Sequence, residues 1–488
     1  MSKLAGLECL DVPGWTGRIG GPSGRHAKVT RSVWFNPVPW TIVALVFTWV
    51  MLMARQAPCW QTSLDHPPNM TGWLCYSDIP VLFRSKISIW SGTALFGNGA
   101  VGSADPQLEY PVLTGGLIWV ARWLSGLFGA TINPAADATQ QMQAANMFWA
   151  VNAFLLFVCF CVLAWAHLQM GRDSASPHTD GVRTRAWDAL FIAASPLVML
   201  SGLINWDLFA VALTSLGLLF WARKHPVFAG CLIGLAAAAK FYPLALIAVF
   251  FLLCFRSGRL QAWAAFLGGT VVTWAAVNLP LMIANPSAWA FFWTYNANRG
   301  PDLGSIWYVL TLMGIPVTNV SLVESITLTV CAVAIVVLVI RAPRRPRVAQ
   351  VALLVMVAFL VCNKVYSPQY VLWLLPIVVL ARPVVFDLLI FTCSETLYYL
   401  AVWGFLDGVL GIGSGPDRLY WISVGMRVGV QIWLAARVVQ DMWEPWGDPV
   451  RGPFIDDPIG GVLNHAPDAE WFLRGSARPA PTPVAAQS

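Results

Sequence analysis

The chain has 488 residues, of which 57% are hydrophobic and only 11% are charged, and it contains 26 tryptophans. A soluble domain is nearer a quarter charged, so this composition excludes an ordinary soluble protein and indicates a polytopic membrane protein built from helices. The net charge of +6 is small for this length and is concentrated in short loops, which argues against nucleic-acid binding and fits orientation signals.

The first orientation signal lies before the first apolar span, at about residues 40–54. Basic residues near a span end stay in the cytoplasm, and three of them precede this span: Arg25, Lys28 and Arg31. We therefore expect residues 1–38 to form a cytoplasmic tail. The densest basic loop, residues 341–347, should face the same side.

The segment after the first span is expected to stay outside. Within residues 110–130, Arg122 lies between Trp119 and Trp123, a pattern typical of an interfacial helix and not of a crossing. The next crossing then begins at about residue 145. This predicts a first extracytoplasmic loop over residues 55–144, with interfacial helices.

The middle of the chain predicts a hairpin and a broken helix. Spans at about 187–203 and 206–222 should form the hairpin, with its tip facing outward. The following apolar run, residues 227–255, is interrupted by Lys240-Phe-Tyr-Pro243. Proline lacks the amide hydrogen of a helix interior, and a broken helix at membrane depth needs a cavity or a protein environment. We predict two short half-helices whose tip brings Lys240 towards the outer side.

The rest of the chain completes an all-α bundle of about 12 transmembrane helices, both half-helices included. The other spans lie at about 145–168, 260–284, 321–340, 348–363, 368–381, 384–405 and 419–440. Residues 39–440 would form this transmembrane domain, with a second outer loop at 285–320. Residues 441–488, rich in Pro, Gly and Ala, are expected to be a cytoplasmic tail whose last dozen residues are disordered.

Asp78, in the first outer loop, is the candidate catalytic base. A carboxylate in this role needs an acceptor hydroxyl within hydrogen-bond reach and a pKa raised by partial burial. The alternative is a surface carboxylate that caps a short helix starting at Pro80.

Other polar groups should gather on the same outer side, and a charged group within a span is a functional-site hypothesis by default. The alternatives are a structural Lys240–Asp207 pair and, for residues 363–370, a plain interfacial turn. The candidate substrate-binding residues are Glu109, Tyr110, Asn205, Asp207, Lys240, Tyr242, Arg299, Lys364, Tyr366 and Gln369.

Two of the ten cysteines, Cys59 and Cys75, fall in the predicted first outer loop. They form either a disulfide, which an oxidising compartment preserves, or two unpaired thiols. No His, Cys or Asp cluster has metal-ligand spacing and no phosphate-binding glycine loop occurs, so the sequence predicts no metal and no cofactor.

Four short motifs occur in an order that resembles glycosyltransferase family 87, the polyprenol-phosphate-mannose-dependent α-1,2-mannosyltransferases of actinobacteria with the C-type (GT-C) membrane fold. They are Ser77-Asp78 with Phe83, Glu109-Tyr110-Pro111-Val112, Asn205-Trp206-Asp207, and the run from Ala229-Gly230 through Gly234-Leu235-Ala236 to Lys240-Phe-Tyr-Pro243. The resemblance covers about residues 40–440 and implies that Asp78 is the base. The family often has His near the Ser-Pro-X-Tyr turn where this chain has Gln369, which leaves Lys364 or Lys240 for the lipid phosphate.

The sequence thus predicts a multi-pass plasma-membrane enzyme with both termini cytoplasmic and its active site outside. It would transfer a sugar, with mannose favoured, from a polyprenyl-phosphate donor to a cell-envelope glycan or glycolipid, with inversion. The alternatives are an arabinofuranosyltransferase of the same fold and a lipid flippase or transporter. The expected partners are the lipid-linked donor, the acceptor and membrane lipids, with no nucleic acid; no oligomeric state is predicted.

Overall fold

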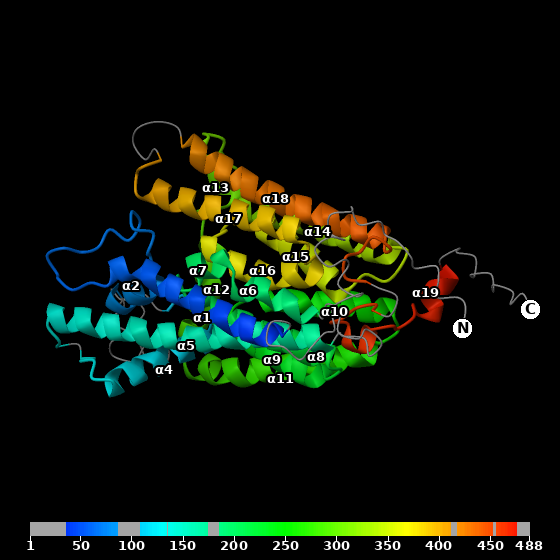
Figure 1. Cartoon of the computed structure of the whole chain (residues 1–488), viewed down its shortest axis with the longest axis horizontal. Coiled ribbons are helices and arrows are strands. Elements are labelled where there is room, and N and C mark those ends of the chain that lie inside the picture. Colours follow the sequence, from blue (N-terminus) through cyan, green and yellow to red (C-terminus); the bar gives the residue numbers. More distant parts are fainter. Residues whose placement is uncertain are drawn as a thin grey trace, which may run out of the picture.

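Helices form the whole regular structure of the described residues, which contain no β-strand (Figure 1). The computed structural model describes residues 36–85, 108–133, 135–173, 185–410, 417–451 and 455–475. Most of the predicted amino-terminal tail, residues 86–107 of the predicted first outer loop and residues 476–488 of the predicted carboxyl-terminal tail lie outside these ranges.

Six of the described helices are long and apolar enough to cross a membrane. They are α1 (Pro37–Gln56), α5 (Ala138–Asp173), α11 (Leu260–Ala284), α14 (Val320–Arg341), α17 (Val385–Leu406) and α18 (Arg418–Trp443). Shorter apolar helices accompany them: α4 (Val112–Leu127), α8 (Asp207–Ala222), α9 (Pro226–Ala239), α10 (Ala245–Arg256), α15 (Val348–Cys362) and α16 (Val371–Ala381). The prediction of an all-α polytopic membrane protein is confirmed.

The apolar run after α8 breaks where the sequence predicts. Helix α9 ends at Ala239, Lys240 has an extended backbone (φ −156°, ψ 148°), and a 3-10 turn over Tyr242–Leu244 leads into α10. Pro243 lies inside that turn, where its missing amide hydrogen costs no helical hydrogen bond. The predicted pair of half-helices is therefore present.

The span expected at about 187–203 is not a single helix. The segment forms a 3-10 turn (Arg185–Ala189) and two short helices, α6 (Leu190–Ala193) and α7 (Pro196–Ser201). Pro196 cannot donate to the preceding turn, and Ser195 starts α7 by accepting a hydrogen bond from the Leu197 amide at 3.2 Å. Apolar composition alone did not reveal this interruption.

Glycines bring α9 and α11 into close contact and so fix the position of the broken tip. A Cβ atom on Gly230 would lie 2.0 Å from the Phe266 carbonyl oxygen, and one on Gly234 would lie 2.5 Å from that of Thr270. From the other side, a Cβ on Gly269 would lie 2.5 Å from the Val227 carbonyl oxygen. Small residues allow such backbone approach between membrane helices, and the first two belong to the glycine motif noted in the sequence.

The two ends of the bundle differ in what covers them (Figure 1). One end, which we call the cavity end, holds the short helices α2 (Asp78–Ser85), α12 (Pro286–Asn298) and α13 (Ile306–Leu312), together with a disulfide between Cys59 and Cys75. Of the two states left open for these cysteines, the structure has the disulfide. The opposite end, the tail end, is covered by residues 444–451 and 455–475, which include α19 (Glu470–Gly475).

Candidate functional site

A cavity of about 840 Å³ lies at the cavity end of the bundle. Its walls come from five parts of the chain that the sequence singled out: the start of α2, the segment before α4, the turn before α8, the broken tip between α9 and α10, and the turn at 363–370. Helix α12 and the segment that follows it complete the wall.

Asp78 is fixed in this wall through its backbone. The Asp78 amide donates to the Ile204 carbonyl oxygen at 2.7 Å, and the Ser77 hydroxyl donates to that of Leu203 at 2.6 Å. Ser77 Oγ also accepts from the Ile79 amide at 3.4 Å, so Ser77 caps the first turn of α2. The capping function proposed as the alternative for Asp78 therefore falls to its neighbour, and the Asp78 carboxylate faces the cavity.

Tyrosine hydroxyls hold the Asp78 carboxylate. Tyr110 donates to Asp78 Oδ2 at 3.2 Å, and Tyr76 is hydrogen-bonded to the same carboxylate. Burial raises the pKa of Asp78 to about 6, although these hydrogen bonds and the charge of Lys240 act in the opposite direction. Glu109, also on the cavity wall, raises it further by charge repulsion. A carboxyl with a pKa near 6 is ionised at neutral pH and still basic enough to take a proton.

Lys240 pairs with Asp207, as the alternative for these residues predicted. Lys240 Nζ lies 2.8 Å from Asp207 Oδ1, and the side chain of Asp207 is only 1% exposed. The indole of Trp373 donates to the other carboxylate oxygen, Oδ2, at 3.1 Å. The Asp207 amide in turn donates to Asn205 Oδ1 at 2.9 Å, which shapes the turn before α8.

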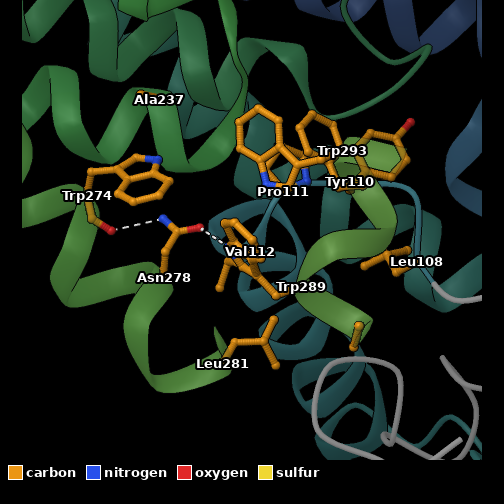
Figure 2. A pocket seen from close by; sticks show the side chains of 12 residues that line it. Leu108, Tyr110, Pro111, Val112, Ala237, Trp274, Asn278, Leu281, Trp289 and Trp293 are labelled. Atoms are coloured by element: carbon orange, nitrogen blue, oxygen red, sulfur yellow. Dashed lines mark hydrogen bonds between the residues drawn. The ribbon is translucent and has the colours of Figure 1, made fainter. Parts of the chain in front are cut away.

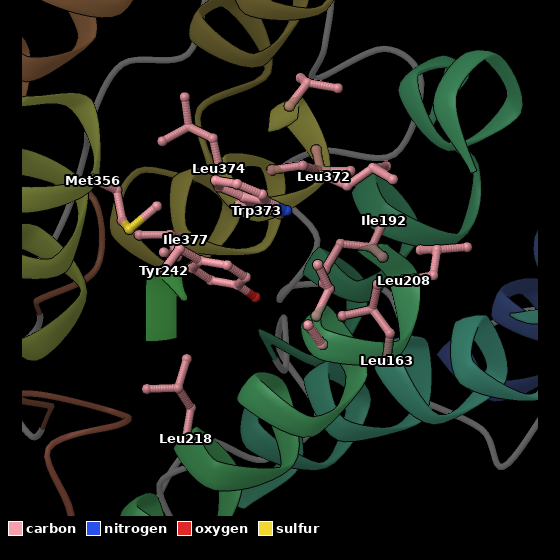
Figure 3. Packing of buried hydrophobic residues seen from close by; sticks show 14 of the residues in the cluster. Leu163, Ile192, Leu208, Leu218, Tyr242, Met356, Leu372, Trp373, Leu374 and Ile377 are labelled. Atoms are coloured by element: carbon pink, nitrogen blue, oxygen red, sulfur yellow. The ribbon is translucent and has the colours of Figure 1, made fainter. Parts of the chain in front are cut away.

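Aromatic rings surround this ion pair. The ring of Tyr242 stacks on Trp373 with centroids 4.7 Å apart (Figure 3), and Tyr370 stacks on the same indole at 3.8 Å. The Tyr242 hydroxyl donates to Thr214 Oγ1 at 3.0 Å, deep in the bundle. The stack joins the broken tip to the turn at 363–370.

The turn at 363–370 is braced from several sides. Lys364 Nζ donates to the Ala297 carbonyl oxygen at 2.8 Å and to Ser321 Oγ at 2.9 Å, tying the end of α12 to the start of α14. Arg299 forms an ion pair with Asp302, and the side chains of both are 33% exposed. The Arg299 side chain is therefore more exposed than Lys364, which is buried.

Tyr366 lies behind the cavity wall, in a buried polar network. Arg427 stacks on its ring with the guanidinium carbon 3.5 Å from the centroid, and Gln431 donates to its hydroxyl at 2.6 Å. Arg427 and Glu395 form a buried ion pair at 2.9 Å. This buried network supports the turn at 363–370 from the side away from the cavity.

The structure brings most of the predicted site residues together. Two of them, Asp207 and Tyr366, lie behind the lining. The cavity itself is lined by Asp78, Glu109, Tyr110, Asn205, Lys240, Tyr242, Arg299, Lys364 and Gln369.

Sequence reasoning missed several lining residues. Trp373 and Glu324 lie in long apolar runs, where hydrophobic periodicity does not distinguish a cavity wall from a lipid-facing surface. Trp293 lies in α12, at the edge of the cavity beside Tyr110 and Pro111 (Figure 2). The clustering of aromatic residues at 289–295 is the one local signal that could have pointed to this wall.

A smaller apolar pocket adjoins the cavity between α4, α9, α11 and α12 (Figure 2). It shares Tyr110 and Trp293 with the cavity, and Trp274 and Trp289 also line it. Asn278 holds these two together: it donates to the Trp274 carbonyl oxygen at 2.9 Å and accepts from the Trp289 indole at 3.0 Å. Within the described ranges, no group of three or more His, Cys, Asp or Glu side chains is arranged to hold a metal ion.

Comparison with known proteins gives one family. The family model described as glycosyltransferase family 87 matches residues 111–363, just over half of the chain. The matched segment contains the Asn205 turn, the broken tip and Arg299, whereas Asp78 precedes it and Lys364 follows it. No curated protein matches the chain.

Proposed function

The chain belongs to glycosyltransferase family 87 and is a membrane glycosyltransferase; from this premise we propose that it transfers mannose from a polyprenyl phosphate to a cell-envelope glycan or glycolipid. The transfer takes place at the extracytoplasmic face of the plasma membrane and inverts the anomeric centre. Asp78 is the catalytic base.

The observation that supports this proposal most strongly is the environment of Asp78. Its carboxylate lines a cavity of about 840 Å³, large enough for a sugar and part of an acceptor, and tyrosine hydroxyls hold it. Its pKa of about 6 suits a base that works near neutral pH. Asp78 lies at the start of α2, outside the long apolar helices, and it lines the cavity through which an acceptor would reach it.

The proposed reaction is a single displacement. The acceptor hydroxyl gives its proton to Asp78, and its oxygen bonds to the anomeric carbon of the donor sugar. The bond between that carbon and the phosphate oxygen breaks, and the polyprenyl phosphate leaves with the electron pair. One attack from the face opposite the leaving group produces inversion.

Arg299 is the residue that we assign to the leaving phosphate. Lys240 is already 2.8 Å from Asp207, and Lys364 is occupied by Ala297 and Ser321. Arg299 also pairs with Asp302, but its side chain is one-third exposed and borders both the cavity and an adjacent pocket, and its planar guanidinium has further N–H groups that can bind phosphate oxygens. Stabilisation of developing charge usually contributes more to the rate of such transfers than any other single effect.

The surroundings of the cavity suit a lipid-linked sugar. Aromatic rings line it, and Trp and Tyr rings pack well against the apolar faces of sugars. The adjoining pocket in Figure 2 is also lined largely by apolar and aromatic side chains. The basic loops at the other end of the bundle favour a cytoplasmic tail end, which would place the cavity outside.

A donor comparison tests the proposal. The purified chain in lipid nanodiscs receives radiolabelled polyprenyl-phosphate mannose, polyprenyl-phosphate arabinofuranose or a nucleotide-linked mannose, with a cell-envelope glycolipid extract as acceptor. We expect transfer from polyprenyl-phosphate mannose, with the opposite anomer in the product. Preference for arabinofuranose would change the sugar and keep the reaction class. Transfer from the nucleotide donor alone, or lipid movement across vesicles without any transfer, would contradict the proposal.

A further inference from the structure

Lys240 occupies a position that its pairing with Asp207 does not fully explain. Its ammonium lies 5.4 Å from the ring centroid of Tyr110 and 5.6 Å from those of Tyr370 and Trp373. Cations within about 6 Å of an aromatic centroid are attracted by the ring. Three rings and one carboxylate therefore fix the ammonium, although its side chain is 16% exposed to the cavity.

The backbone on both sides of Lys240 is also fixed. Its amide donates to the Ala236 carbonyl oxygen at 2.8 Å, and the carbonyl oxygen of Ala239 accepts from Thr114 Oγ1 of α4 at 2.7 Å. The cation lies at the carboxyl end of α9, where the helix dipole favours positive charge. Lys240 is thus held from α4, α8, α9 and α16 at once.

Tyr110 connects Lys240 to the base. Its ring lies next to the ammonium, and its hydroxyl donates to Asp78 Oδ2 at 3.2 Å. Trp206 packs edge-on against the same ring, with centroids 5.1 Å apart, and the Trp206 indole is anchored on Asn152 at 2.7 Å. The Tyr110 ring therefore has an apolar contact from Trp206, a cation beside it, and its hydroxyl directed at the carboxylate.

We propose that Lys240 is a positioning residue for the base: held by Asp207, it keeps Tyr110 in place against the Asp78 carboxylate, and it does not bind the donor phosphate. The inference rests on the proposed function, because it assigns a role in that same site. A phosphate at Lys240 would have to approach a cation that already has a buried carboxylate at 2.8 Å. It would also meet the negative charge of Asp78.

The charges around Asp78 determine the direction in which its pKa should move when Lys240 is replaced. The groups that act on it are Tyr76, Tyr110, Glu109 and Lys240. Lys240 lowers the pKa of Asp78, and Glu109 raises it. Loss of the ammonium therefore moves the acidic limb of the pH–rate profile to higher pH. A nearby opposite charge typically changes a carboxyl pKa by about one to three units; we expect the low end, a shift of about one pH unit, because Lys240 is also paired with Asp207.

A double variant avoids leaving a buried charge without its partner. Lys240→Met alone would strand the Asp207 carboxylate and could prevent folding, so the main variant is the double change Lys240→Met with Asp207→Asn. Lys240→Arg, which keeps the charge, tests for rescue. Lys224→Met, at an exposed position at the tail end, is the matched control.

Two measurements distinguish the roles. The first is the pH dependence of kcat and KM for polyprenyl-phosphate mannose. The second is the affinity for polyprenyl monophosphate, measured by titration without turnover. For the double variant we expect kcat at pH 6 to fall about fivefold, because raising the pKa of Asp78 from about 6 to about 7 lowers its ionised fraction at that pH from about one half to about one tenth. The acidic limb should move up, while donor KM and polyprenyl monophosphate affinity stay within about twofold. Lys240→Arg should return the acidic limb of the pH–rate profile to its wild-type position.

The opposite pattern would overturn the inference. If Lys240 binds phosphate, the double variant loses polyprenyl monophosphate affinity by about tenfold or more and keeps the wild-type limb. That result would leave the proposed function intact, because a lipid phosphate would still bind. If wild-type protein neither binds polyprenyl monophosphate nor transfers sugar from it, the proposed function itself fails.

Discussion

Asp78 at the cavity end is held differently from the ion-paired carboxylates at the tail end. At the tail end, Asp448 takes two hydrogen bonds from Arg347, at 2.8 and 2.9 Å, and both side chains are almost fully buried. Asp468 is held in the same bidentate way by Arg256. At the cavity end, the Asp78 carboxylate receives hydrogen bonds from tyrosine hydroxyls. Bidentate arginine pairs neutralise a carboxylate, whereas tyrosines orient it and leave it basic.

We infer that the ion-paired carboxylates at the tail end stabilise the fold, whereas Asp78 takes part in the reaction. The basic loop at 341–347 is an orientation signal in the sequence, and in the folded chain the tail residues Asp448 and Asp456 pair with its arginines. The cavity end uses its charges differently, since Asp78 and Arg299 both remain directed at a cavity. Substitutions at the cavity end should therefore act on turnover, and those at the tail end on stability.

The largest effect is expected from Asp78→Asn. Loss of a general base typically lowers a rate by about 10²–10⁴-fold, and an amide of the same shape keeps the hydrogen bond from Tyr110. Sugar transfer in nanodiscs should fall by this amount while the thermal unfolding midpoint changes little. Asp65→Asn, at an exposed position in the segment between α1 and α2, is the control and should retain full activity. Near-normal turnover by Asp78→Asn would refute the assignment.

Asp448→Asn should produce the reverse result. It removes the counter-ion of a fully buried arginine, which typically costs about 3–5 kcal/mol. The unfolding midpoint in detergent should drop, and the molecules that remain folded should keep their turnover. Glu444→Gln, at an exposed position nearby, is the control. Equal stability of the two variants would show that the tail end does not depend on its ion pairs.

Removal of the disulfide should weaken the cavity end. Cys59 and Cys75 are 16 residues apart, and a closed loop of about this length contributes roughly 3 kcal/mol. Cys75 also lies three residues before Asp78. We expect Cys59→Ala with Cys75→Ala to unfold at lower denaturant concentration than Cys393→Ala, which changes an exposed free cysteine. Alkylation of both thiols in unreduced, denatured wild-type protein would contradict the disulfide itself.

The pH profile should give the smallest but most specific signal. Because burial raises the pKa of Asp78 to about 6, the base is ionised above that pH and protonated below it. kcat/KM should therefore rise with pH, with a midpoint near 6, and fall about tenfold per unit on the acidic side. Asp65→Asn should show the same limb. A midpoint near 4, the ordinary value of a carboxyl, would place the base in an open, solvated site.

The sequence predicted the fold well wherever a local pattern determines the structure. Long apolar runs predicted the long helices, and Pro243 predicted the break that exposes Lys240. The pairing of Lys240 with Asp207 could be anticipated because a charge within a span needs a partner. Ser77 as the helix cap was missed, since both Ser77 and Asp78 suit that position.

What the sequence did not show depends on contacts between distant segments. Arg347 and Asp448 are 101 residues apart, and nothing near either residue indicates the other. Residues 455–475 have the composition of a polar tail, yet their carboxylates fold back onto basic loops. Trp373 was missed for the same reason: its role comes from Asp207, 166 residues away.

The most direct test is a structure of the wild-type chain with a non-transferable phosphonate analogue of polyprenyl-phosphate mannose. We predict that the phosphonate oxygens lie at hydrogen-bond distance, roughly 3 Å, from Arg299, and that the anomeric carbon faces Asp78 across the cavity. A sugar bound away from Asp78, or a phosphonate held at the tail end of the bundle, would contradict the assignment of this carboxylate as the base.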